Sequence, residues 1–99
     1  MSDEIRADYE HLEQVSARML GQSKAVHELL NMVRSRMDPL ESGSWIGRGS
    51  DAFFAEMNGE VLPASQRLQQ ALEEAGQVTR QIAQTMRQAE EEASSPFRV

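Results

Sequence analysis

The stretch Glu41-Ser42-Gly43-Ser44-Trp45-Ile46-Gly47-Arg48-Gly49-Ser50 decides the fold, because it is the one short break between two long amphipathic segments. Three glycines and three serines among these ten residues favour a turn over a continuing helix. A connection of this length between two long helices makes them antiparallel neighbours. The sequence therefore predicts a helical hairpin, and its turn holds the chain's only tryptophan.

The segment before the break has an apolar residue at every seventh position. The row consists of Ile5, Leu12, Met19, Val26, Val33 and Leu40, with Tyr9, Val15, Leu29, Leu30 and Met37 three or four residues further on. A heptad pattern of this length predicts a long helix that packs along its whole length. We expect the first helix at about residues 4–40 and the turn at about residues 41–50.

The segment after the break repeats the pattern. Its row consists of Phe54, Val61, Leu68, Ala75, Ile82 and Ala89, and Leu72 and Met86 widen it. Ser50 suits the N-cap of this helix, and Asp51 suits the positive end of its dipole. We expect the second helix at about residues 51–92, followed by a flexible tail at 93–99.

Small residues and one proline modify the second helix. Ala64, Ala71 and Ala75 would let a neighbouring helix approach closely. Pro63 would clash with the carbonyl group of Gly59, so a kink is expected there. Because the apolar row continues past the proline in the same heptad, the pattern predicts a kink without a skip in register.

The predicted fold is all-α: one domain over residues 1–99 that forms an antiparallel two-helix hairpin. Each helix has an apolar stripe wider than one helix–helix contact can cover, which marks an interface. One arrangement places Leu12, Val26, Val33, Leu68 and Ile82 inside the hairpin, whereas Tyr9, Leu30, Met37, Leu72 and Met86 point partly elsewhere. A second hairpin would close the structure into a four-helix bundle. The residues expected to form the core and dimer stripe are Leu12, Met19, Val26, Leu30, Val33, Phe54, Val61, Leu68, Leu72 and Ile82.

Composition excludes several classes of function. The net charge of −6 argues against nucleic-acid partners and anionic membranes, which need clustered Lys and Arg. No apolar run is long enough for stable insertion into a membrane, and the acidic start of the chain is not a secretory signal peptide. His11 and His27 lie on different faces of the first helix and lack the pattern of a metal site. We therefore expect no metal, no cofactor and no enzymatic activity.

An acidic chain of about a hundred residues, with two long helices and Trp45-x-Gly47 at its midpoint, resembles the WXG family. These are the early-secreted-antigen-like small proteins of bacterial type VII secretion. The resemblance implies a dimer that folds in the cytoplasm and is secreted by a machine with an FtsK/SpoIIIE-type ATPase. Members act as effectors, as virulence factors or as helpers for the export of larger toxins. The resemblance allows either a homodimer or a heterodimer with a sister protein. The apolar row of the first helix is uninterrupted and has no buried polar residue, which favours the homodimer.

The resemblance also suggests an export signal in two parts. Trp45 and Gly47 form the turn part, and Trp45 could equally serve to plug the end of the hairpin. The family's second part is a C-terminal Tyr-x-x-x-Asp/Glu, where this chain has Met86 and Glu90; its only tyrosine, Tyr9, is on the first helix. The alternative function is an intracellular four-helix adaptor whose Trp45 turn is a plain loop.

Overall fold

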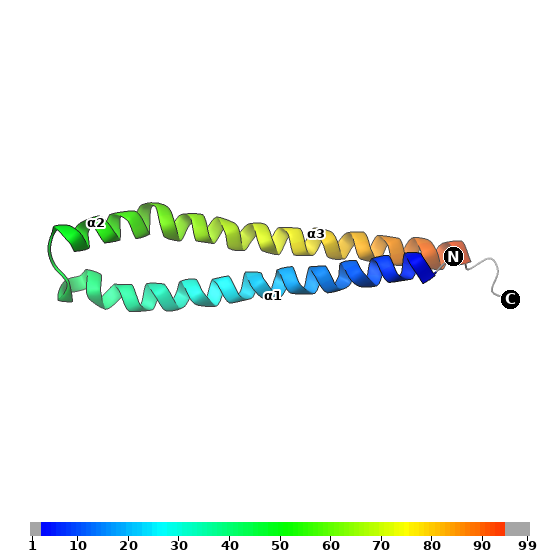
Figure 1. The fold of residues 1–99 in the computed structure, drawn as a ribbon, viewed down its shortest axis with the longest axis horizontal. Helices are drawn as coiled ribbons and strands as arrows, with labels where there is room; N and C mark the ends of the chain where they lie inside the picture. Colours follow the sequence, from blue (N-terminus) through cyan, green and yellow to red (C-terminus); the bar gives the residue numbers. More distant parts are fainter. Residues whose placement is uncertain (1–2, 95–99) are drawn as a thin grey trace. The chain divides into compact units, whose positions relative to one another are not determined.

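The computed structural model describes residues 3–94, and their regular structure is entirely helical (Figure 1). Its elements are α1 (Asp3–Pro39), the π-helical turn η1 (Leu40–Ser44), α2 (Arg48–Glu56), the π-helical turn η2 (Met57–Val61) and α3 (Leu62–Ser94). The predicted all-α helical hairpin is confirmed, whereas its dimerisation remains a prediction. Of the expected tail at 93–99, α3 includes the first two residues, and 95–99 lie outside the described residues.

The chain divides into two compact units, and each is described by itself. The turn unit is Gln22–Ala71, and the terminal unit combines Met1–Gly21 with Leu72–Val99, of which residues 3–21 and 72–94 are described. In each unit a part of α1 lies antiparallel to a part of the second helical segment (Figure 1).

Large apolar side chains fill the core of the turn unit. Leu30, Met37, Phe54 and Leu62 are buried, and Val26, Val33 and Met57 pack against them. Ser23 is a buried polar residue between the helices. Its hydroxyl donates to the Gln69 carbonyl at 3.1 Å, and the side-chain amide of Gln69 donates to the Ser23 hydroxyl at 3.3 Å. Burial of apolar area is therefore the main stabilising contribution here.

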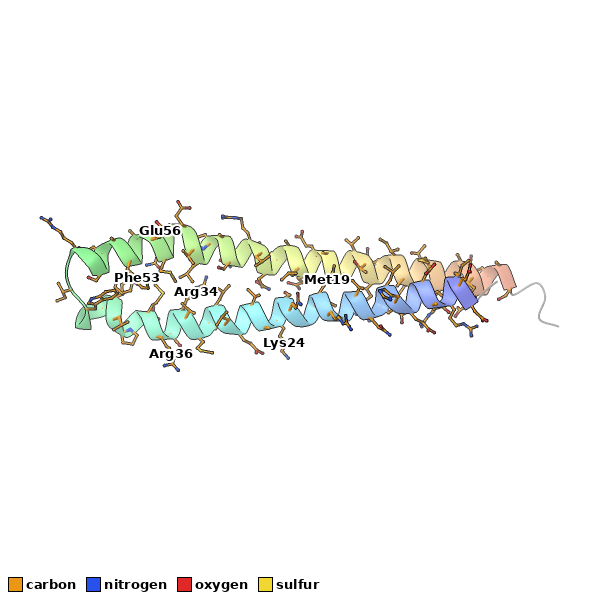
Figure 2. The ribbon with its side chains drawn as sticks, in the orientation of Figure 1. Met19, Lys24, Arg34, Arg36, Phe53 and Glu56 are labelled. Carbon is orange, nitrogen blue, oxygen red and sulfur yellow. The ribbon has the colours of Figure 1, made fainter. Side chains whose placement is uncertain are left out.

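Small side chains form the closest contact between the helices of the terminal unit. The Ser16 hydroxyl is buried and donates to the Gly76 carbonyl at 2.7 Å, and Ala83 is completely buried. A Cβ atom added to Gly76 would lie 2.8 Å from Leu20 Cγ and 3.3 Å from the Leu20 backbone nitrogen. The two backbones therefore approach closely only because residue 76 has no side chain. Met19 points toward α3 in Figure 2, and the Thr79 hydroxyl contacts its sulfur at 3.9 Å.

The prediction of a kink without a skip was wrong. The turn η2 is a π-helical bulge, in which the Leu62 N–H donates to the carbonyl of Met57, five residues earlier. This turn contains one residue more than an α-helical turn, and it places Pro63 in the first turn of α3, where a missing N–H is tolerated. The buried positions consequently step by eight residues, from Phe54 to Leu62, where the heptad pattern predicted Val61.

The observed division of the apolar stripe differs from the expected one, and on α3 the skip is the reason. Leu68 and Ile82, expected inside the hairpin, are about half exposed, and so is Val61. The residues expected to point elsewhere form the inner face instead: Tyr9, Leu30 and Met37 are buried, and Leu72 and Met86 are half-buried, as are Leu12, Met19, Val26 and Val33. Ala64, Ala71 and Ala75, expected at a close helix contact, are exposed on the described chain. One extra residue in a helical turn rotates every following residue by about 100°.

Candidate functional site

Gly47 sets the backbone at the start of α2. It is the N-cap of this helix, with φ of 139° and ψ of 179°, a conformation that residues with a Cβ rarely adopt. Its carbonyl accepts the N–H of Asp51 at 3.0 Å and the hydroxyl of Ser50 at 2.8 Å. The prediction that Ser50 is the N-cap is therefore wrong. The helix begins earlier, at Arg48, and Ser50 is a buried residue in its first turn.

Three aromatic rings meet beside this turn. The Trp45 ring centroid lies 5.4 Å from that of Phe53 and 5.6 Å from that of Phe54, and the two phenylalanine centroids are 5.3 Å apart. The rings are tilted or edge-to-face, which are the favourable arrangements for aromatic pairs. Phe54 belongs to the buried core, so its ring contacts join the other two rings to the core of the turn unit.

Trp45 is only partly covered by this cluster. It is 41% exposed, Phe53 is 40% exposed, and Ile46 between Trp45 and Gly47 is 85% exposed. The turn therefore presents an apolar surface to solvent, chemically suited to contact with another protein. Phe53 and Ile46 were not among the predicted site residues, although two adjacent phenylalanines shortly after the turn were a usable signal.

A second cluster lies in the terminal unit around Tyr9, whose side chain is buried. The guanidinium carbon of Arg87 lies 5.0 Å from the centre of the Tyr9 ring, and Arg87 forms an ion pair with Glu13 at 2.9 Å. A cation over an aromatic face and a carboxylate partner hold Arg87 from two sides. This Tyr9–Glu13–Arg87 cluster joins the start of α1 to the end of α3.

Glu90, a predicted site residue, lies beside this cluster. A side-chain hydrogen bond with Tyr9 is the main cause that raises the pKa of Arg6, and the charges of Tyr9 and Glu90 add to it. Arg6 therefore interacts with both Tyr9 and Glu90. Met86 is half-buried on the inner face of the same unit. Tyr9 is far from Glu90 in the sequence, but the two share one electrostatic neighbourhood in the fold.

Among residues 3–94, His, Asp and Glu side chains form no group of three that could hold a metal ion. None of the helices described there has a stretch long and apolar enough to cross a membrane.

A hairpin with Trp45-x-Gly47 at its turn and amphipathic helices on both sides defines a class of small helical proteins. The family model described as proteins of 100 residues with WXG matches residues 4–91 of this chain. The chain therefore belongs to the WXG100 family, and the predicted resemblance is confirmed. Membership implies a small secreted protein of type VII secretion systems. No curated protein and no solved structure matches the chain.

Proposed function

We propose that the protein is a non-catalytic substrate or co-export partner of a type VII secretion system, and that it leaves the cell as a folded homodimer. The observation that carries the proposal is the family match over residues 4–91, with Trp45 and Gly47 at the turn. In this proposal the FtsK/SpoIIIE-type ATPase of the machine recognises the exposed turn surface. The homodimer is supported by the apolar side chains left exposed on both helices of the turn unit.

The proposal is tested by exchanging Trp45 for alanine and comparing it with Phe53→Ala. The two rings belong to one cluster and are almost equally exposed, at 41% and 40%, so both exchanges remove a similar apolar contact. Export is measured as the ratio of protein in the culture medium to protein in the cells. We expect Trp45→Ala to abolish export and Phe53→Ala to preserve most of it.

Circular dichroism and sedimentation of both purified variants separate recognition from folding. Loss of export with native helicity and an intact dimer supports the proposal. Normal export of Trp45→Ala contradicts it. If Trp45→Ala loses its helicity, and this loss of folding alone explains any change in export, the tryptophan has a structural role. That outcome favours the intracellular adaptor.

The C-terminal part of the proposed signal is Met86 with Glu90. Tyr9 adds an aromatic ring to the surroundings of Glu90, although it comes from α1 and not from the position of Met86. Combined exchange of Met86 and Glu90 for alanine is expected to reduce export. Unchanged export of this double variant would remove the two residues from the signal without affecting the role of Trp45.

A further inference from the structure

A side-chain hydrogen bond joins the two π-helical turns that flank the Trp45 turn. The turn η1 comes directly before Trp45, and η2 follows α2. The side-chain amide of Asn58 in η2 donates to Glu41 Oε1 in η1 at 3.1 Å, across 17 residues of sequence. Turns of this kind are rare and are often found at functional sites. The hydrogen bond therefore connects the last turn before the hairpin loop with the helical segment that returns from it.

Trp45 is attached to both of these segments. Its N–H donates to the Leu40 carbonyl at 3.2 Å and so closes η1, the turn that contains Glu41. Its ring contacts Phe53 and Phe54 of α2 on the other side of the loop. The tryptophan is thus held by one segment through its backbone and by the other through its ring. Both contacts are satisfied together only if η1 keeps its place relative to α2.

The two hydrogen-bonded residues occupy matching positions beside the core. Asn58 follows the buried Phe54 by four residues, and Glu41 follows the buried Met37 by four residues. Residues with this spacing lie on one side of a helix, so each polar side chain continues the inner side of its own segment. Both residues are exposed, and their hydrogen bond contributes little to folding. It is directional, however, whereas the apolar contacts of the core are not.

We propose that Glu41 and Asn58 are positioning residues for the turn that the secretion machine recognises. Their hydrogen bond fixes the place of η1, and with it the surface that Trp45 presents. This inference rests on the proposed function and adds to it two residues that act through Trp45 and not by their own contact with the partner. One residue is a charged acceptor and the other a neutral donor, so exchanging the two groups reverses the bond without changing the net charge.

Reversal of the hydrogen bond provides the main test. Asn58→Asp places a second carboxylate beside Glu41, and the repulsion is expected to lower the export ratio about threefold. The double variant Glu41→Gln with Asn58→Asp has the net charge of the original protein, and its new amide at position 41 donates to the new carboxylate at position 58. Its export should return close to the original level. A double variant that exports no better than Asn58→Asp contradicts the positioning role.

Asn31→Asp is the matched control for the added charge. Asn31 is the other asparagine of the chain and is exposed in the same unit. Its amide lies 3.3 Å from His27 Nε2 on its own helix, so this exchange adds a carboxylate without affecting a bond across the hairpin. Export of Asn31→Asp should be unchanged. An equal loss in Asn31→Asp and Asn58→Asp means that the charge alone is responsible, and it overturns the inference.

Fluorescence separates positioning from stability, because Trp45 is the only tryptophan. Asn58→Asp is expected to shift the emission of the folded protein to longer wavelength while helicity is retained, and the double variant should reverse the shift. A lower urea midpoint with unchanged emission of the folded protein shows a bond that only stabilises, and this contradicts the inference. If Asn58→Asp does not fold, Asn58→Ala removes the bond without a new charge, and unchanged emission and export of that variant contradict the inference equally.

The exchange of Trp45 separates this inference from the proposed function. Normal export of Trp45→Ala overturns the proposed function, and the positioning role with it. Blocked export of Trp45→Ala, with Asn58→Asp exported as well as Asn31→Asp, overturns the positioning role alone. Blocked export of Trp45→Ala, reduced export of Asn58→Asp and recovery in the double variant are the results expected from both proposals.

Discussion

The turn unit and the terminal unit use the same two antiparallel helices but stabilise them differently. In the turn unit large side chains, Leu30, Met37, Phe54 and Leu62, form the core beside the turn, and the Ser23 hydroxyl reaches the Gln69 carbonyl further along the helices. In the terminal unit the closest contact is made by Ser16 and Gly76, which has no room for a Cβ atom, while Tyr9 is buried near the start of α1. A heptad pattern therefore specifies a helical pair without specifying the size of the side chains at its contacts.

The largest effect is expected from truncation of the large-residue core in the turn unit. Phe54→Ala removes a buried ring that contacts both Trp45 and Phe53, and it should lower the free energy of unfolding by about 3 kcal/mol. Urea titration followed by circular dichroism at fixed protein concentration measures this. The neighbouring Phe53→Ala, which is 40% exposed, should cost clearly less. Equal losses would show that the core does not depend on the buried ring.

The terminal unit should be most sensitive at its closest helix contact. Gly76→Ala places a methyl group 2.8 Å from Leu20 Cγ, and the helices must separate, which should cost about 2 kcal/mol. Gly21→Ala is the control in the same unit, because nothing lies within 4 Å of its added Cβ and it should stabilise the helix by about 1 kcal/mol. Opposite signs in the same urea titration are the expected result. A neutral Gly76→Ala variant would contradict the close contact.

The sequence predicts the helices well, because apolar residues at positions such as Leu12, Val26 and Leu68 recur with the helical period. It does not predict which part of the stripe faces inward. That depends on whether Pro63 bends the helix or adds a residue to the preceding turn, and both avoid the same steric clash. In the structure the turn before Pro63 contains the extra residue, and this local feature places Leu68 and Ile82 at the surface.

The candidate site, too, could be predicted from the sequence only in part. Trp45 and Gly47 could be found from sequence, since an aromatic and a glycine in a helix break are locally unusual. The 41% exposure of Trp45 could not be predicted from the sequence, because it depends on how Phe53 and Phe54 pack beside this ring. Nor could the neighbourhood of Tyr9 and Glu90 be predicted, since it requires the register of two helices across the terminal unit.

A smaller effect is expected from the buried hydroxyl of the terminal unit. Ser16→Ala removes the donor at 2.7 Å from the Gly76 carbonyl and should cost about 1 kcal/mol. Ser35→Ala is the matched control, because its hydroxyl bonds a carbonyl on an exposed part of α1, that of Met32. Thermal and urea unfolding should distinguish the two variants. If Ser35→Ala is the more damaging exchange, the buried hydrogen bond is not a main contact between the helices.

The smallest effect is expected from the ion pair of the Tyr9–Glu13–Arg87 cluster. Glu13→Gln keeps the shape of the side chain and leaves Arg87 over the Tyr9 ring, so only the charge attraction is lost. Both partners are partly exposed, at 35% for Glu13 and 45% for Arg87, and the loss should be about 0.5 kcal/mol. At about 1 M salt the difference from the original protein should shrink, because the pair is screened. Glu10→Gln, which removes an exposed and unpaired carboxylate of α1 within the described chain, corrects for the change in net charge. A loss for Glu13→Gln that persists at high salt would mean that Glu13 contributes through packing and not through its charge.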